Sequence, residues 1–350
     1  MSPPAPTLDF LPRGASGDIL VVKPSSLGDI VHTLPAVAWL HQAWPEWRIH
    51  WVVNTEWMPL LQGSPLLASV VEFPRTQFRG WTGGRRALHW IREFRAAMLR
   101  HPIQLALDFQ GLLRSAALAR LSGARVLIGL DDAREGARFF YRTVIPTRTP
   151  QGRVLHSIDR YLGLVRALQP ECPETSALNG DWLPLGDPVD GLPTQPFIAL
   201  HPFARGAGKS LGWPAVEILA AGWRNTPVVV VGRTDDPPPP SLPPHVQNLA
   251  NTTSLLQLIH VLRRAAGVVS ADSGPMHLAS ALRRPLLGIH TWSDPRSVGP
   301  YSHNAWIWKG GHIVRRSQID PALAAQHRPP SPAELTQIAA HLLQEFPRMS

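Results

Sequence analysis

The chain has 350 residues, 44% of them apolar, which is enough for two domains with separate hydrophobic cores. No apolar run approaches the ~18 residues of a membrane-spanning helix, and a single cysteine excludes an internal disulfide bond. Lys and Arg outnumber Asp and Glu by 34 to 25, so the net charge of +9 favours anionic partners. Blocks of Lys and Arg, zinc-finger spacings and aromatic RNP-type strands are missing, so no nucleic-acid partner is expected.

The first half of the chain predicts a parallel α/β domain. Residues 1–17 are rich in proline and are expected to form a flexible leader. From there on, short apolar segments alternate with amphipathic ones, as in a parallel sheet with helices on both faces. In this first Rossmann-like domain, 18–180, strands are expected at 18–23, 48–53, 103–109 and 125–130, and helices at 29–43 and 112–123.

The same alternation begins again after a polar linker at 181–196 that is rich in proline and glycine. The second Rossmann-like domain, 197–330, has expected strands at 197–202, 227–232, 266–272 and 285–290, and expected helices at 213–223, 254–265 and 274–284. The segment 331–350 opens with a capping-box pattern and predicts a last helix, which we expect to pack back on the first domain. The fold class is therefore α/β, with two Rossmann-like domains facing a central cleft.

The segment VVKPSSLGD, residues 21–29, joins the first predicted strand to the first helix. In one interpretation it is only a connection, with Gly28 in the turn and Asp29 as the helix N-cap. In the other, Asp29 is a general base, because loops at the carboxyl ends of parallel strands face the ligand in this fold class. The segment is not a phosphate-binding P-loop, since its lysine precedes the glycine.

The segment SADSGPMHLASAL, residues 270–282, is the strongest anion-site candidate. A buried strand ends at Asp272, Ser273 and Gly274 follow, and proline marks the first turn of the next helix. Free backbone N–H groups and the positive end of the helix dipole favour a phosphate there. His277 lies in that first turn, where it is either a ligand contact or a half-buried histidine beside a capped helix.

Two further loops carry weaker signals. Residues 201–214, HPFARGAGKSLGWP, follow a predicted strand and contain Arg205 and Lys209. They form either a solvated basic loop or a site at which a cation neutralises a diphosphate leaving group. Asp235 and Asp236 follow the strand VVVVG, a position from which an acidic side chain can bind ribose hydroxyls.

Three segments resemble the bacterial lipopolysaccharide heptosyltransferases, an inverting glycosyltransferase family (family 9), and come nearest to its heptosyltransferase I branch. They are ILVVKPSSLGDIVHTLPAV, LALDFQGLLRSAALA and ADSGPMHLASALRRPLLGIHTWSDPRSVGPY. The resemblance implies a GT-B fold with the acceptor on the first domain and the nucleotide-sugar on the second. The implied donor is ADP-L-glycero-β-D-manno-heptose and the implied acceptor is a Kdo sugar of lipid A.

The resemblance also implies individual roles. Asp29 would take the proton from a Kdo hydroxyl that attacks opposite the departing ADP, which inverts the anomeric configuration. Lys209 would assist catalytically by contacting the diphosphate. The expected donor-binding residues are Arg205, Lys209, Asp236, Asp272, Ser273, Gly274 and His277. The expected acceptor-binding residues are Ser25, Ser26, Gly28, Arg85, Arg86, Gln110 and Arg134.

The implied enzyme is cytoplasmic, monomeric and peripheral on the anionic inner face of the inner membrane, and it needs no cofactor and no metal. The sequence departs from the family on the donor side. Phe203 and Ala204 replace hydroxyl residues, and the loop around Lys209 carries inserted residues. The ribose-binding Glu of relatives has no Glu match, although Asp236 falls at a similar offset from Gly232. Alternatives are transfer of another nucleotide-activated sugar or to another glycan, and a non-catalytic nucleotide-sugar-binding protein.

Overall fold

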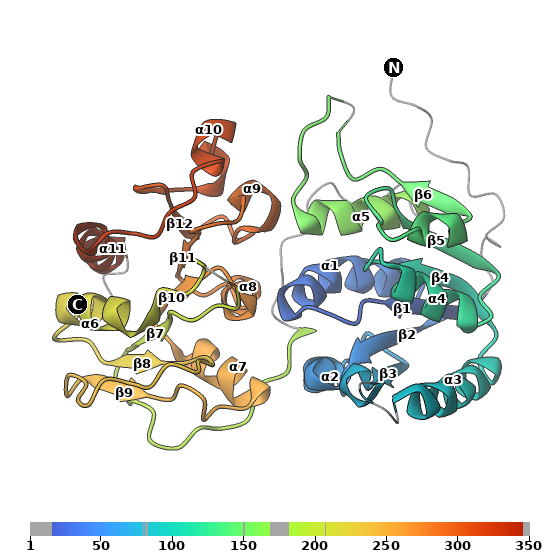
Figure 1. The fold of residues 1–350 in the computed structure, drawn as a ribbon, viewed down its shortest axis with the longest axis horizontal. Helices are drawn as coiled ribbons and strands as arrows, with labels where there is room; N and C mark the ends of the chain where they lie inside the picture. The colour runs from blue at the N-terminus through green and yellow to red at the C-terminus, as the bar shows by residue number, and fades with distance from the viewer. Residues whose placement is uncertain are drawn as a thin grey trace. The chain divides into compact units, whose positions relative to one another are not determined.

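A computed structural model describes residues 16–78, 80, 83–149, 151–168, 182–206 and 208–345. The chain divides into two compact units, Met1–Ser176 and Ala177–Ser350, and each contains a sheet flanked by helices (Figure 1). The predicted leader, 1–17, lies outside the described residues except for its last two. The boundary between the units falls just before the predicted linker.

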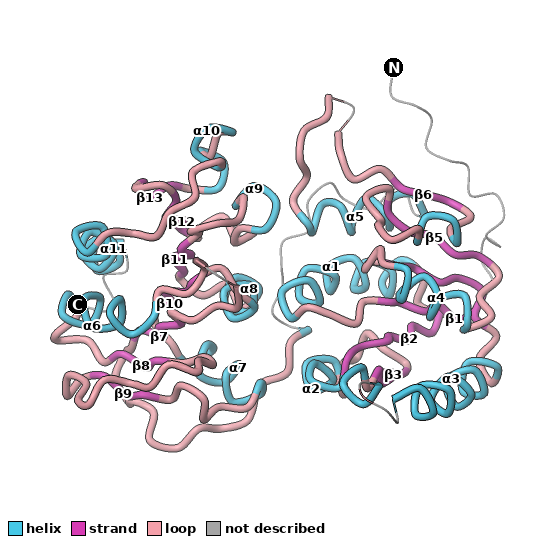
Figure 2. The backbone as a smooth tube through the Cα atoms, in the orientation of Figure 1, coloured by secondary structure: helices cyan, strands magenta, loops and turns pink. Residues whose placement is uncertain are grey.

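The first unit is built on a parallel sheet, in which the described strands follow the order β3-β2-β1-β4-β5-β6 (Figure 2). The strands are β1 Gly17–Val22, β2 Trp47–Asn54, β3 Ser69–Phe73, β4 Ile103–Asp108, β5 Val126–Leu130 and β6 Thr143–Ile145. The side chains of Ile19–Val22 have no exposed surface, because helices cover both faces of the sheet. The four predicted strands of this unit are confirmed to within two residues, and the two edge strands are additions.

The helices of the first unit are α1 Leu27–Ala43, α2 Met58–Leu61, α3 Gly83–Leu99, α4 Leu113–Leu121 and α5 Ser157–Leu168. α1 begins two residues earlier than predicted, and its N-cap is Ser26. The prediction that Asp29 could be the N-cap is therefore wrong, and Asp29 lies in the first turn instead. Among the helices that the structure describes, none combines the length and the apolar character that crossing a bilayer requires.

The second unit has a similar sheet, with the described strands in the order β13-β12-β11-β10-β7-β8-β9. Neighbouring strands are parallel except for the β12–β13 pair. The strands are β7 Ile198–His201, β8 Val228–Val230, β9 Val246–Asn248, β10 Gly267–Ala271, β11 Leu286–Ile289, β12 Trp306–Lys309 and β13 His312–Val314. The helices are α6 Gly212–Gly222, α7 Leu255–Arg264, α8 Gly274–Ala281, α9 Pro295–Val298, α10 Pro321–Ala324 and α11 Pro332–Glu345.

The final helix, α11, packs on α6 of the second unit. The expected contact of this helix with the first domain stays a prediction. Leu335, Ile338 and Leu342 are buried in the core that also contains Leu219 of α6. The Trp223 indole N–H donates a hydrogen bond of 3.0 Å to the carbonyl of Ala339. The sequence shows that this helix has an apolar face, but it does not show which element that face packs against.

The close approach of α6 and α11 at Gly222 predicts how substitutions there change the stability of the protein. A Cβ atom added at Gly222 would lie 2.6 Å from the Cβ of Ala339. We expect Gly222→Ala to destabilise the protein by about 1–3 kcal/mol, as overpacking does. Gly163→Ala in α5, where an added Cβ meets nothing within 4 Å, should instead be neutral or gain up to about 1 kcal/mol of helix stability. The measurement is chemical denaturation followed by tryptophan fluorescence.

The pair of substitutions Gly222→Ala and Ala339→Gly together should recover at least half of the loss, because the second removes the atom that the first meets. Equal stability of the single variant and the wild type would mean that the two helices do not approach this closely in solution.

Candidate functional site

The turn from β1 to α1 holds Asp29 in a fixed orientation. The backbone N–H of Ser26 donates to Oδ2 of Asp29 at 3.1 Å, and the Ser26 hydroxyl donates to the same oxygen at 2.8 Å. The hydroxyl of Tyr161, from α5, lies 3.5 Å from Oδ1. The carboxylate is thus anchored through one oxygen by the N-cap residue of its own helix, while the other oxygen is directed toward α5.

Lys23 is a site residue that the sequence analysis missed. It follows β1 directly and is only 3% exposed, and its ammonium donates to the Phe109 carbonyl at 2.9 Å. The same ammonium lies 5.1 Å from the centre of the Tyr161 ring. Burial alone would lower the pKa of Lys23, but Tyr161 and Asp29 outweigh it and leave the pKa raised. A positive charge therefore persists beside Asp29 at neutral pH.

Asp108, the last residue of β4, shapes the neighbouring loop. Its Oδ1 accepts hydrogen bonds from the backbone N–H groups of Gln110 and Gly111, at 2.9 and 3.1 Å. Its Oδ2 accepts from the hydroxyls of Ser115 and Tyr141, both at 2.8 Å. Burial raises the pKa of Asp108, although these hydrogen bonds oppose the shift. The loop after β4 is consequently fixed at both of its ends.

A polar cavity of about 300 Å³ opens beside Asp29. It brings together Asp29, Gln110 and Arg134, three of the residues that the sequence analysis selected. Arg160 also faces it and forms an ion pair with Asp132. The cavity is lined by Lys23, Asp29, Phe109, Gln110, Gly111, Leu130, Asp132, Arg134, Arg160 and Tyr161.

The remaining acceptor candidates divide into two groups. The Ser25 backbone N–H donates to the Gln110 side chain at 3.4 Å, and Gly28 is buried in the first turn of α1, so both lie at the same turn as Asp29. Arg85 and Arg86 are exposed residues of α3 and do not line the cavity. The structure therefore does not join these two arginines to the Asp29 site.

In the second unit, Asp272 follows β10 and forms an ion pair with Lys209. The Lys209 ammonium is 3.4 Å from Oδ2 of Asp272, and the two side chains are 31% and 9% exposed. Burial favours a higher pKa for Asp272, but the charges of His290 and His277 and a hydrogen bond from Ser293 lower it below its ordinary value. Asp272 is therefore a carboxylate at neutral pH, held next to a cation.

The start of α8 has an unusual N-cap. Ser273 is the N-cap residue, but its hydroxyl contacts His201 Nδ1 at 3.1 Å and makes no cap hydrogen bond to its own helix. Burial lowers the pKa of His201 to about 4, so this imidazole is neutral. Gly274 and Pro275 form the first turn, and His277 is buried in it. The predicted strand-turn-helix unit is confirmed.

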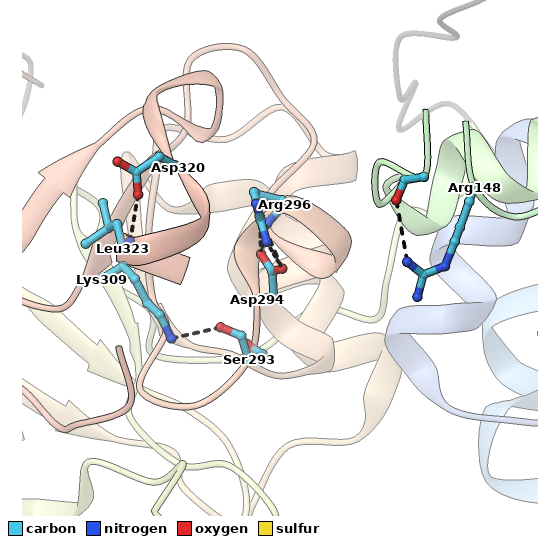
Figure 3. Close-up of polar contacts among 8 residues, drawn as sticks. Arg148, Ser293, Asp294, Arg296, Lys309, Asp320 and Leu323 are labelled. Carbon is cyan, nitrogen blue, oxygen red and sulfur yellow. Dashed lines mark hydrogen bonds and ion pairs between the residues drawn. The ribbon is translucent and has the colours of Figure 1, made fainter. Parts of the chain in front are cut away.

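Lys309 and Ser293 also belong to this region and were not selected from the sequence. Lys309 is the last residue of β12, is fully buried, and donates to the Ser293 carbonyl at 3.0 Å (Figure 3). Burial lowers the pKa of Lys309, while Asp294 and Asp272 oppose the shift. The signal in the sequence was a lysine ending an apolar strand, as at Lys23.

Arg205 and Asp236 are exposed, and among the described residues no contact joins them to the Asp272 cluster. The backbone carbonyl of Asp236 accepts a hydrogen bond from the indole of Trp213 at 3.1 Å, which fixes the backbone of its loop. Phe203 packs edge-on against Trp213, with ring centres 5.1 Å apart. Phe203 thus belongs to the buried core of this unit.

Solved structures share this fold. Escherichia coli heptosyltransferase WaaC with ADP superimposes with a TM-score of 0.69 at 24% identity, over 95% of this chain and 100% of that chain. E. coli ADP-heptose lipopolysaccharide heptosyltransferase II gives a TM-score of 0.66 at 20% identity, over 94% and 99% of the two chains. The predicted α/β class with two Rossmann-like domains of the GT-B type is confirmed.

Sequence comparison gives the family. The model of glycosyltransferase family 9 (heptosyltransferase) matches residues 91–318. Lipopolysaccharide heptosyltransferase 1 of Pseudomonas aeruginosa is 30% identical over 317 residues, which cover 82% of this chain and 82% of that protein. Its counterpart in E. coli K12 is 27% identical over 309 residues, covering 83% and 92%. The chain therefore belongs to glycosyltransferase family 9, the heptosyltransferase family.

Proposed function

We propose that this protein transfers a heptose from an ADP-activated heptose to a Kdo sugar of lipid A in lipopolysaccharide core synthesis. Relatives named lipopolysaccharide heptosyltransferase 1 support the reaction type. A neighbour of the same fold was solved with ADP-2-deoxy-2-fluoro heptose, which supports the donor class. The observation that carries the proposal is the anchored carboxylate of Asp29 at a polar cavity, beside the buried cation Lys23.

In this mechanism Asp29 is the general base. Ser26 anchors Oδ2, so Oδ1 accepts the proton from the attacking hydroxyl as that oxygen bonds to the anomeric carbon. The positive charge of Lys23 lies close to Asp29 and offsets the negative charge of its carboxylate. Attack occurs on the face opposite the departing ADP, so the configuration at the anomeric carbon inverts.

The donor diphosphate is assigned to the second unit, at Lys209 and the amino end of α8. Lys209 is held near that end by its ion pair with Asp272. Its charge and the helix dipole neutralise the charge that develops on the departing ADP. In this proposal the transfer step needs no metal ion.

The acceptor is assigned to the cavity of the first unit. Arg134 lines this cavity and supplies a planar guanidinium, which suits the carboxylate of a Kdo sugar. Arg85 and Arg86 are exposed on α3 and suit a different partner, the anionic surface of the inner membrane and the phosphates of lipid A. The protein then works at the inner face of that membrane.

The proposed function is tested by incubating the purified protein with ADP-heptose and Kdo-lipid A and following ADP release and the mass of the lipid product. A mass increase of one heptose supports the proposal. ADP binding without any product would favour the non-catalytic alternative, and product only with another nucleotide-sugar would replace the donor.

A first prediction concerns the base. Asp29→Asn keeps the shape of the side chain and an oxygen that can accept from Ser26, but it cannot accept the proton, so turnover should fall by about 10²–10⁴. ADP affinity should stay at the wild-type level, whereas the melting temperature should fall because the buried charge of Lys23 loses a partner. Asp190→Asn, at an exposed carboxylate of the second unit, is the matched control and should be fully active. Turnover of Asp29→Asn within threefold of wild type would remove Asp29 from the mechanism.

A second prediction concerns the donor. Lys209→Ala removes the cation beside Asp272, so the dissociation constant for ADP, measured by calorimetry, should rise at least about tenfold, as expected for a charge-assisted contact. Arg224→Ala, at an exposed position after α6, removes a charge elsewhere and should leave ADP binding unchanged. If both variants bind ADP like the wild type, the diphosphate lies elsewhere.

A third prediction separates the arginines of the first unit. Arg134→Gln should lower turnover on a soluble, delipidated acceptor and on a vesicle-embedded one alike, because it loses a sugar contact. The double variant Arg85→Glu/Arg86→Glu should lose more than tenfold binding to anionic vesicles at low salt, since each basic residue near such a surface contributes about 1 kcal/mol. Its turnover on the soluble acceptor should be unchanged. If instead Arg134→Gln weakened vesicle binding and the double variant lowered turnover on the soluble acceptor, Arg134 would contact the membrane, and Arg85 and Arg86 would contact the sugar.

A further inference from the structure

Asp18, His50 and His101 form a second cluster in the first unit, away from the Asp29 site. Asp18 lies at the start of β1 and His50 in the adjacent strand β2, while His101 lies in the turn between α3 and β4. One ligand atom from each lies within 4.8 Å of the other two. Because Asp29 follows the opposite end of β1, about 16 Å of extended chain separates Asp18 from the turn that carries Asp29.

In this cluster one pair of ligand atoms is hydrogen-bonded and the other is too far apart for a hydrogen bond, so an ion would replace the first contact and fill the second. Oδ1 of Asp18 is 2.7 Å from Nε2 of His50 and 4.0 Å from Nδ1 of His101. The second distance is too long for a hydrogen bond, and Nδ1 of His101 is buried without a hydrogen-bond partner in the described structure. Two ligand atoms of a tetrahedral zinc ion lie about 3.3 Å apart, which is midway between the two observed distances.

The atoms that would not bind the ion are already held by neighbours. Nδ1 of His50 contacts the Ser69 hydroxyl at 2.7 Å. Oδ2 of Asp18 accepts from the Arg48 guanidinium at 2.7 Å. Such contacts orient metal-binding imidazoles and carboxylates in known sites.

We infer that Asp18, His50 and His101 form a binding site for a divalent transition-metal ion of the Zn²⁺ type. The site would tie the start of β1 to β2 and to the turn before β4, and it takes no part in sugar transfer. Two imidazoles and one carboxylate favour Zn²⁺ over Mg²⁺, which prefers oxygen ligands. Arg48 contacts Oδ2 of Asp18, whereas the ion would bind Oδ1. The Arg48 side chain is 57% exposed, so its charge is screened by water.

The test is a titration of the metal-free full-length protein with Zn²⁺ in competition with a chromophoric chelator. The wild type should bind one ion tightly, and Mg²⁺ should not compete. His101→Ala leaves the Asp18, His50 and Arg48 contacts in place, and it should weaken zinc binding by at least about tenfold, the lower end of the loss seen when a supporting residue of a site is removed. His89→Ala, at an exposed histidine of α3, is the matched control and should bind zinc like the wild type.

Two further readouts distinguish this site from adventitious binding to other histidines. Saturating Zn²⁺ should raise the melting temperature of the wild type and of His89→Ala, but not that of His101→Ala, because only an ion that binds the folded state stabilises it. Co²⁺ should develop a visible absorption band on the wild type that His101→Ala lacks. Equal zinc affinity for His101→Ala and the wild type, or a wild type without any tight ion, would overturn the inference. Asp29→Asn should bind zinc normally, so the result is independent of the proposed transfer reaction.

Discussion

The buried ammonium group of Lys23 is the interaction on which the first unit's site depends. A charge removed from water is costly unless it is paired and hydrogen-bonded. Lys23 meets this requirement with the Phe109 carbonyl, the face of the Tyr161 ring and the nearby charge of Asp29. These partners come from the loop after β4, from α5 and from α1. A single cation therefore fixes three segments around one cavity, and the position of Asp29 follows from this arrangement.

The second unit contains a similar arrangement at the end of its own sheet. Lys309 is fully buried at the end of β12, and its charge acts on Asp272 and Asp294. Lys209, from the loop after β7, pairs with Asp272 from the partly exposed side. In both units, then, a carboxylate that follows a central strand lies close to a lysine placed on or after a strand. Loops at the carboxyl ends of parallel strands are where α/β sheets bind their ligands, and charged groups are tolerated there because the loops supply hydrogen-bond partners.

The central strands and the main motifs were predictable from the sequence, whereas several partners were not. Strands such as β1 are buried on both faces, so they appear as continuous apolar runs. The edge strand β3, with the sequence SVVEF, is only partly buried and carries no such run. Helix α3 is rich in arginine, which hides its narrow apolar face. Local sequence patterns therefore predicted strands that are buried on both faces, but not the partly buried strand β3 or the arginine-rich helix α3.

The burial of Lys23 could not be predicted from the sequence for a different reason. A lysine at the end of a strand is usually solvated, and what buries this one is Phe109, 86 residues further along the chain. One interpretation of the sequence made Asp29 the N-cap of α1, but the backbone shows that Ser26 is the capping residue. Asp236 matched a family position by its offset alone, but it lies in an exposed loop without a contact to the Asp272 cluster in the described structure.

The packing of α11 on α6 has a consequence for how such a protein can change over time. Because its last helix stays with the second unit, each unit is a continuous stretch of the chain, and the polypeptide passes from one to the other once. Recombination near the boundary, or drift confined to one half, can therefore alter one unit while the other keeps its packing.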